Sequence, residues 1–460
     1  ALRSMVYGLG FNLVYLSWYL GLHPLSWMGF ADWQSIGIVT FCWLFVTSHQ
    51  ALIYGLFGAV VRLLPLSGDF LPTKVENRWR LPAFVVIPLL WCLIQTKIGN
   101  APDLLGVPWS MIEYTQYKQT ALIQMCSIGG GIGLSALILL ANVAIACLIA
   151  TFSKKLIYKS LAAKQRSSAV AQACLPALLV ALSVAFGYAR LAGGLPVAQE
   201  PVSLIQGNIN IEMQKSKHRY TLSELVEHYH GLTANLPPGF CVLTESALPA
   251  YLKESPLLLT YFTERCRQKK FNFLLGSIDR QDGASFNSAF GITDNGVLLK
   301  DVYHKRYLVP VGEYKPAFLN YLPSWLQRLT DTPAGTGFSA GRKPVVLDFA
   351  GKMVAPLICF ETISPELMVS SVRNGGSILI NISDLAWFHD SIIGDQAAAM
   401  AVFRAVESDR YFVYVANTGP SMIIDSLGRI VERSDSQKSL VLTGAVSLRN
   451  SRTPFVQWFN

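Results

Sequence analysis

The sequence predicts a multi-span α-helical membrane domain followed by an α/β domain, and two observations carry this prediction. Of the 460 residues, 52% are hydrophobic and only 15% are charged, which is too apolar for an ordinary soluble protein. Residues 1–199 hold 13 Lys or Arg and 5 Asp or Glu, whereas residues 200–460 hold 25 and 24, so the net charge of +9 divides into +8 and +1. The charge-rich half is nearly neutral, which argues against a nucleic-acid partner.

Five apolar stretches in the first half are candidate membrane spans. Crossing about 30 Å of hydrocarbon takes roughly 20 helical residues. The stretches are apolar on every side, whereas helices of a soluble bundle carry a polar stripe. They lie near residues 5–22, 36–61, 81–97, 121–152 and 168–190. We expect the three glycines at 129–131 to interrupt the fourth stretch, and we expect a further segment before residue 1.

The basic residues of this half predict its orientation. Ten of the 13 fall at the start of the chain or in two loops, one after the second span and one before the last. They are Arg3, Arg62, Lys74, Arg78, Arg80, Lys154, Lys155, Lys159, Lys164 and Arg166. By the positive-inside rule these loops are cytoplasmic. We therefore expect the second half to lie on the outer face of a cytoplasmic membrane.

After the linker at residues 193–201 the sequence changes character. Short apolar, β-branched runs alternate with amphipathic stretches, as in an α/β domain. The predicted strands lie near 202–208, 241–245, 272–278, 286–293, 354–359, 377–383, 411–416 and 421–425, and the predicted helices near 221–235, 255–270, 364–374 and 391–409. The domains implied are a transmembrane domain at 1–192, an extracytoplasmic α/β domain at 200–450 and, at 451–460, the start of a return to the membrane.

Three of the eight cysteines, Cys241, Cys266 and Cys359, fall in the outer domain, so at least one of them is unpaired within the chain. Cys241 lies in an apolar run and Cys266 in a charged helix, and we expect neither to be reactive. Cys359 ends the apolar run VAPLIC and precedes a Ser-Pro helix start. A strand-to-helix corner presents its side chain at the carboxyl edge of a sheet, where active sites of α/β folds lie.

A nucleophilic thiol needs a proton acceptor and preferably a cation nearby. Glu245 ends the run CVLTE, where a carboxylate is costly unless it is paired or functional. Lys305 follows another strand, and Glu313 lies eight residues beyond it. Each charge alone is most simply a solvated strand end, but the three together with Cys359 indicate a catalytic site. The single histidines His49, His304 and His389 lack zinc-type spacing, so we expect no metal and no cofactor.

These residues stand in a series of motifs. They are SLIQGNI (203–209), TESALP, YHKRYLVPVGEY, FSAG (338–341), LICFE, AWFHDS (386–391), ANTGPS (416–421) and, in the first half, GVPW (106–109). The series resembles the motifs of the apolipoprotein N-acyltransferase family, membrane-bound members of the nitrilase or carbon–nitrogen hydrolase superfamily. The intervals are also similar, with 60 residues from Glu245 to Lys305 and 54 from Lys305 to Cys359. The resemblance implies a nitrilase-like α-β-β-α sandwich for the second domain.

The resemblance further implies ping-pong transfer of a fatty acyl chain from a phospholipid to the α-amine of a diacylglyceryl lipoprotein cysteine. Cys359 would carry the chain as a thioester, Glu245 would be the general base and Lys305 would stabilise the oxyanion. Phe360 would add its backbone amide, Glu313 would orient Lys305 and Glu245, and Glu361 and Trp387 would support the site. We expect a monomer.

The chain departs from the family pattern at Phe360, Asp384-Leu385, His389 and Lys215, which leaves the substrate contacts open. Two other functions also stay open. A membrane-tethered amidase or nitrilase would use the same three residues on a small amide or nitrile, since a fold does not separate transfer from hydrolysis. A non-catalytic interaction subunit would tolerate their loss, but all three are present.

Overall fold

The computed structural model describes residues 1–67, 73–75, 78–99, 109–157, 163–195, 197–216, 219–310, 312–314, 321 and 337–459. The chain forms two compact units. The helical unit consists of residues 1–19 and 40–194, and the α/β unit of residues 20–39 and 195–460. Residues 20–39 therefore group with the α/β unit, although the sequence places them among the spans.

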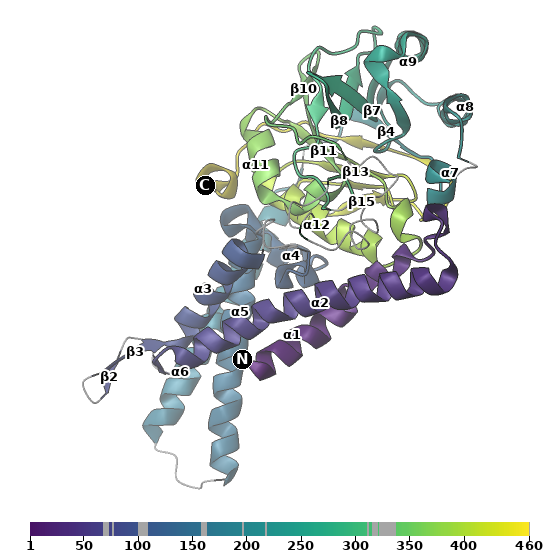
Figure 1. Ribbon diagram of the computed structural model, residues 1–460. Coiled ribbons are helices and arrows are strands. Elements are labelled where there is room, and N and C mark those ends of the chain that lie inside the picture. Colours follow the sequence, from purple (N-terminus) through teal and green to yellow (C-terminus); the bar gives the residue numbers. More distant parts are fainter. Residues whose placement is uncertain are drawn as a thin grey trace. The chain divides into compact units, whose positions relative to one another are not determined.

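The helical unit is built from helices with short connecting strands (Figure 1). In chain order these are α1 (Leu2–Tyr15), α2 (Asp32–Leu63), β1 (Leu66–Ser67), β2 (Thr73–Val75), β3 (Arg78–Pro82), α3 (Ala83–Ile94), the π-turn η3 (Gln95–Gly99), the 3₁₀ turn η5 (Ile112–Gln116), α4 (Thr120–Ile123), α5 (Cys126–Ile157) and α6 (Ala163–Ala192). The first eight residues of α2 belong to the α/β unit.

Three helical segments of the described chain are long and apolar enough to cross a membrane: Asp32–Leu63, Cys126–Ile149 and Cys174–Ala192. The apolar helix Ala83–Ile98 is shorter. Large apolar side chains on these helices are exposed, for example Phe41 at 66% and Ile149 at 61%, as expected for surfaces that face lipid. The helices thus confirm a membrane domain, while the total number of spans stays a prediction.

The expectation of one helix through residues 5–22 is wrong. Helix α1 ends at Tyr15, and the chain continues as a 3₁₀ turn, η1 (Ser17–Leu22). Trp18 is buried there, with its ring 4.1 Å from that of Tyr19 and 5.0 Å from that of Trp109. Aromatic packing within the helical unit, which hydropathy does not report, accounts for the turn. The expected interruption at 129–131 is present, because Gly130 has φ 64° inside α5.

The α/β unit contains two sheets. The first has the strand order β10-β11-β12-β13-β14-β15: β10 (Leu347–Phe349), β11 (Lys352–Ile358), β12 (Ile378–Ser383), β13 (Phe412–Ala416), β14 (Met422–Ile424) and β15 (Ile430–Arg433). The second has the order β16-β4-β5-β7-β8-β9, with β6 paired to β7: β4 (Glu200–Gln206), β5 (Gly239–Val242), β6 (Leu248–Tyr251), β7 (Phe271–Gln281), β8 (Ala284–Ile292), β9 (Tyr303–His304) and β16 (Leu440–Val446). Neighbours β11, β12 and β13 are parallel, as are β4, β5 and β7.

Helices cover the outer faces of the two sheets, which gives an α-β-β-α sandwich (Figure 1). One apolar core joins the facing sheets, for example through Leu204 of β4 and Ile380 of β12, both fully buried. A second core packs α8 (Leu222–Leu232) and α9 (Pro256–Lys269) on the outer face of the β4 sheet. Helices α11 (Pro365–Arg373) and α12 (Ile393–Ser408) accompany the β11 sheet, and the short helices α7 (Ile211–Lys215) and α13 (Pro454–Trp458) complete the unit.

Candidate active site

Cys359 stands at the corner between β11 and the following 3₁₀ turn, η8 (Cys359–Ile363). Its φ of 53° lies in the left-handed region, which a non-glycine residue adopts only when its surroundings impose it. Asn381 of the neighbouring strand β12 holds the corner, because its Nδ2 donates to the Cys359 carbonyl at 3.1 Å. The expected strand-to-helix corner is therefore present.

Glu245 lies in the turn that follows β5, and only 8% of it is exposed. Its Oε1 accepts from Asn287 Nδ2 at 2.8 Å, and its Oε2 accepts from the backbone N–H of Asp384 at 3.1 Å. Gly276 of β7 makes room for the turn, because a Cβ there would lie 2.4 Å from the carbonyl oxygen of Thr244. The position of the carboxylate is thus set by strands from both sheets.

Lys305 follows directly after β9 and is 1% exposed. Its Nζ donates to Glu245 Oε1 at 3.0 Å and lies 2.9 Å from Glu313 Oε2. Its backbone is fixed as well, because the Lys305 N–H donates to the Asn287 carbonyl and its own carbonyl accepts from Gly341, both at 2.8 Å. Gly341 ends the FSAG motif, and only a glycine fits there, since a Cβ would meet the His304 carbonyl oxygen at 2.3 Å.

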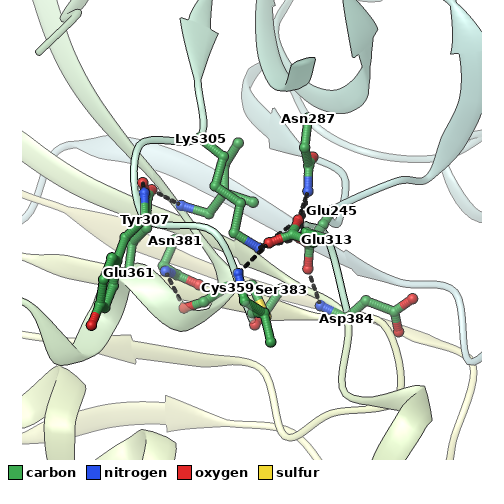
Figure 2. A network of polar contacts seen from close by, with 12 residues as sticks. Glu245, Asn287, Lys305, Tyr307, Glu313, Cys359, Glu361, Asn381, Ser383 and Asp384 are labelled. Atoms are coloured by element: carbon green, nitrogen blue, oxygen red, sulfur yellow. Dashed lines mark hydrogen bonds and ion pairs between the residues drawn. The ribbon is translucent and has the colours of Figure 1, made fainter. Parts of the chain in front are cut away.

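Glu313 completes the buried network around Lys305, as Figure 2 shows. Asn287 donates to its Oε1 at 2.9 Å, and the backbone N–H of Val309 donates to its Oε2 at 2.9 Å. One ammonium thus bridges two carboxylates, and the amide of Asn287 bridges the same two. The structure brings the predicted residues Glu245, Lys305 and Glu313 into direct contact.

The charges of this network act on the Cys359 thiol. Burial raises the pKa of Cys359 to about 12, with a further contribution from the Glu245 carboxylate, although Lys305 and the hydroxyl of Ser383 oppose the rise. Burial likewise raises the pKa of Glu245 against the effect of Lys305. Burial lowers the pKa of Lys305, but the two carboxylates raise it by more, so it lies well above its usual value. The resting site therefore holds a thiol beside a buried carboxylate and a permanent cation.

Glu361 joins the corner at Cys359 to the segment around Lys305. Its Oε2 accepts from the Ile358 N–H and from the Tyr303 hydroxyl, both at 2.7 Å. Its Oε1 accepts from the backbone N–H groups of Arg306 at 2.6 Å and Tyr307 at 3.1 Å. Glu361 is fully buried, and each of its four partners flanks either Cys359 or Lys305. The Glu361 carboxylate therefore connects the backbone next to Cys359 with the segment that carries Lys305.

Phe360 and Trp387 occupy different places. The Phe360 ring stacks on that of Tyr307, 5.4 Å between centroids, so its side chain packs against the segment around Lys305. Trp387 lies in the 3₁₀ turn η9 (Ala386–Phe388) after β12, with its ring 5.2 Å from that of Trp27. Trp387 stands three residues beyond Asp384, whose backbone N–H donates to Glu245.

Sequence reasoning missed three polar residues of the site, Asn287, Asn381 and Ser383, and named Asp384 only as a departure from the family pattern. Asn287 links the two carboxylates, and Ser383 accepts from the Tyr414 hydroxyl at 3.0 Å beside the thiol. For Asn381 and Ser383 a signal was available in the sequence. They are the amide and the hydroxyl in the otherwise apolar run ILINIS, which forms the fully buried strand β12. A buried polar side chain in such a strand is costly without a partner.

The histidines do not form a metal site within the described parts of the chain. No three His, Cys, Asp or Glu side chains are placed there to hold an ion. The imidazole of His304 instead lies 3.0 Å from buried Asp279 and stacks on the Phe286 ring at 4.2 Å. Cys241 and Cys266 are buried free thiols, as expected.

Comparison with known proteins matches both units. The carbon–nitrogen hydrolase family model matches residues 202–453, and the model of the apolipoprotein N-acyltransferase N-terminal domain matches residues 1–144. The apolipoprotein N-acyltransferase of Geobacter metallireducens is 31% identical over 467 residues, which cover 93% of this chain and 86% of the relative. That of Synechocystis is 29% identical over 100% of this chain and 86% of its own length.

Among solved structures, a carbon–nitrogen hydrolase superfamily protein from Xanthomonas campestris is similar over 54% of this chain and 90% of its own, with 16% identity and a TM-score of 0.42. At that score the likeness adds nothing to the assignment, which depends on the family models and the relatives. The matches span the helical unit and the α/β unit alike. The chain therefore belongs to the apolipoprotein N-acyltransferase family, membrane acyltransferases with a carbon–nitrogen hydrolase domain.

Proposed function

We propose that the protein transfers a fatty acyl chain from a phospholipid to the α-amine of the diacylglyceryl N-terminal cysteine of lipoproteins, through a thioester on Cys359. The observation that carries this mechanism is the bridging position of Lys305, 3.0 Å from the carboxylate of Glu245 and beside the Cys359 corner. A cation, a base and a thiol so arranged supply the three groups that acyl transfer through a thioester needs.

In the first half-reaction, the Cys359 sulfur attacks an ester carbonyl of the phospholipid. The thiol of Cys359 is protonated at neutral pH, because its pKa is raised. Glu245 must therefore take the proton as the carbon–sulfur bond forms. Burial raises the pKa of Glu245, which makes it a stronger proton acceptor than an ordinary carboxylate. The tetrahedral oxyanion is stabilised by Lys305 Nζ and the backbone N–H of Phe360. Collapse breaks the ester carbon–oxygen bond, and Glu245 returns the proton to the departing lysophospholipid hydroxyl.

In the second half-reaction, the neutral α-amine of the acceptor attacks the thioester carbonyl. Glu245 takes a proton from the amine nitrogen as the carbon–nitrogen bond forms, and the same donors stabilise the second oxyanion. Cleavage of the carbon–sulfur bond releases the amide product, and the proton passes from Glu245 to the Cys359 sulfur. The site thus returns to its starting state, and two bulky lipids use it in turn.

The proposal places residues 1–192 in a bacterial inner membrane and the catalytic domain, residues 200–450, on its periplasmic face. The support is the accumulation of 10 of the 13 basic residues of the first half at its start and in two loops. The proposal includes a monomer, and the nearly neutral charge of the charge-rich half argues against a nucleic-acid partner.

The two alternative functions have less support. A membrane-tethered amidase would use the same Cys359, Lys305 and Glu245, but three membrane-length helices in the described chain exceed what a tether requires. A binding subunit would have no need of a buried Lys305 between two carboxylates, an arrangement that costs desolvation energy.

The test is the mass of the intact protein after mixing with phospholipid in detergent. We expect an increase of one acyl chain, reversed by hydroxylamine, and its absence in Cys359→Ala. Cys174→Ala is the matched control, because that thiol is exposed on α6 and should not affect acylation. An adduct retained in Cys359→Ala would move the nucleophile elsewhere and overturn the assignment.

A further inference from the structure

A cluster of one cation and two indoles lies next to the active site within the α/β unit. Lys215 ends α7, Trp27 lies in the 3₁₀ turn η2 (Ser26–Met28), and Trp387 lies in η9. The Lys215 Nζ lies 5.9 Å from the Trp387 ring centroid, and the two indoles meet edge to face at 5.2 Å. All three side chains are half-buried, so they have apolar support and remain accessible.

The cluster is fixed to the catalytic base. The backbone N–H of Asp384 binds Glu245, and the Asp384 carboxylate accepts from the Ala386 N–H at 3.0 Å and from Asn417 at 3.1 Å. Trp387 follows directly after this braced turn. The turn is also held from the other side, because the Nδ1 of His389 lies 2.8 Å from the Gly21 carbonyl oxygen. The indole of Trp387 therefore has a defined position relative to Glu245.

Lys215 forms no ion pair in the described part of the chain, although its charge acts on the buried carboxylate of Asp384 and opposes the rise that burial causes in the pKa of that group. Glu212 on the same helix approaches His389 instead, at 4.0 Å. The Lys305 ammonium, by contrast, is committed to Glu245 and Glu313 and is 1% exposed. Of the two lysines, Lys215 is the one that a charged group of an incoming substrate can reach, because its side chain is half-buried whereas that of Lys305 is fully buried.

The two substrates differ in one respect that a lysine can detect. A phospholipid donor carries a phosphodiester next to its glycerol, whereas the diacylglyceryl cysteine acceptor has glycerol and no phosphate. Charge-assisted hydrogen bonds from an ammonium to a phosphate are short and strong. Indole rings favour the boundary between polar and apolar groups, which in a phospholipid is the glycerol.

We infer that Lys215 binds the phosphodiester of the donor phospholipid while Trp27 and Trp387 contact its glycerol region. This inference rests on the proposed function and assigns a donor-specific contact to it. Lys215 acts in the first half-reaction only, because the acceptor has no phosphate to offer. Residues 20–39 supply Trp27 to this subsite, which gives that segment a role in the α/β unit.

The experiment compares Lys215→Gln, Lys215→Arg and the control Lys438→Gln, an exposed lysine paired with Asp435. Single-turnover acylation of Cys359 is measured with phosphatidylglycerol in mixed micelles and with the 4-nitrophenyl ester of the same fatty acid, which lacks phosphate. Lys215→Gln should raise the half-saturating phosphatidylglycerol concentration by about tenfold, the order of one charge-assisted hydrogen bond. Acylation by the nitrophenyl ester and transfer to a diacylglyceryl-cysteine peptide should be unchanged, and Lys215→Arg should largely preserve binding.

Equal losses with both donors in Lys215→Gln would show that α7 positions the site, and the inference would be wrong. Unchanged kinetics with both donors would show that Lys215 makes no contact with the donor, which also overturns it. Failure of the proposed function is a separate outcome, because the unsubstituted enzyme would then form no hydroxylamine-sensitive adduct with phosphatidylglycerol.

Discussion

The hydroxyl of Tyr303 donates to the carboxylate of Glu361 at 2.7 Å, and this bond joins the strand before Lys305 to the turn after Cys359. Both side chains are fully buried. The bond connects two segments that are 58 residues apart in the chain. The separation of the cation and the nucleophile is thus set by one carboxylate between them.

Replacing Glu361 by Gln should therefore damage both folding and chemistry. The Glu361 carboxylate accepts four hydrogen bonds, two on each oxygen. In glutamine one of these oxygens becomes an NH₂ group, which cannot accept. An NH₂ group at the Oε1 position would face the backbone N–H donors of Arg306 and Tyr307. Each buried donor left unsatisfied costs about 1–3 kcal/mol. We expect a clear fall in melting temperature together with loss of acylation. Tyr303→Phe removes one bond and should cost only about 1 kcal/mol, so equal effects of both substitutions would contradict this account.

The pH dependence of acylation should report on Glu245. In the unsubstituted enzyme the rate should fall as pH drops through the pKa of Glu245, which burial raises above its usual value, because protonation removes the base. In Glu245→Gln, Cys359 should be acylated only through the small fraction of its thiol that is ionised. Burial keeps the pKa of Cys359 above its usual value even without the contribution of the Glu245 carboxylate, so the thiolate fraction and with it the rate of Glu245→Gln should rise steadily from pH 7 to 9. A flat profile in Glu245→Gln would exclude Glu245 as the base.

Lys305→Met should slow both half-reactions. Each passes through a tetrahedral anion, and the loss of one oxyanion donor typically costs about 10² to 10³ in rate. Removing the ammonium also leaves Glu245 beside Glu313 without a counter-charge, so the pKa of Glu245 should rise further. Single-turnover acylation and transfer from pre-formed acyl-enzyme separate the two steps.

Lys305→Arg should not restore the rate, because a planar guanidinium presents its donors in a different geometry. Lys352→Met is a suitable control, as that lysine is partly exposed and pairs with Glu200 outside the site. If Lys305→Met acylated normally and only transfer failed, Lys305 would belong to acceptor binding.

Labelling from outside the cell tests the proposed orientation. A membrane-impermeant maleimide should modify a cysteine placed at Lys438, an exposed residue of the α/β unit, in intact spheroplasts. A cysteine placed at Ser160, which lies outside the described residues, should react only after permeabilisation, because five basic residues surround it. The unsubstituted chain supplies the background from its own thiols. The reverse pattern would put the catalytic domain in the cytoplasm.

The α/β fold and the residues that meet in the candidate site could be predicted because each leaves a local pattern in the sequence. The apolar run that ends at Cys359 and the carboxylate that ends CVLTE are both visible in a few residues. The structure places Cys359 directly after β11 and Glu245 in the turn that follows β5. The strand β16, in contrast, was not expected. It pairs with β4, about 240 residues earlier, and its seven residues are mostly half-exposed, so its pattern resembles a surface loop.

The contacts among site residues could not be predicted for the same reason. Asn287 bridges Glu245 and Glu313 only because three distant segments meet at one sheet edge. The grouping of residues 20–39 with the α/β unit could not be predicted either. Hydropathy reports the apolar character of the neighbouring stretches, but it does not report the packing of Trp27 on Trp387. Long-range packing decides both, and sequence spacing does not contain it.

The left-handed backbone conformation of Cys359 affects how substitutions at this position change the stability of the fold. A non-glycine residue held at φ 53° costs on the order of 1 kcal/mol, and glycine does not bear that cost. Cys359→Gly should therefore unfold at a higher temperature than Cys359→Ala, although both lack the nucleophile. Glycine would give this corner the highest stability, but glycine has no thiol. If Cys359 forms the proposed thioester, the protein keeps a locally destabilising backbone conformation at the position where the reaction requires sulfur.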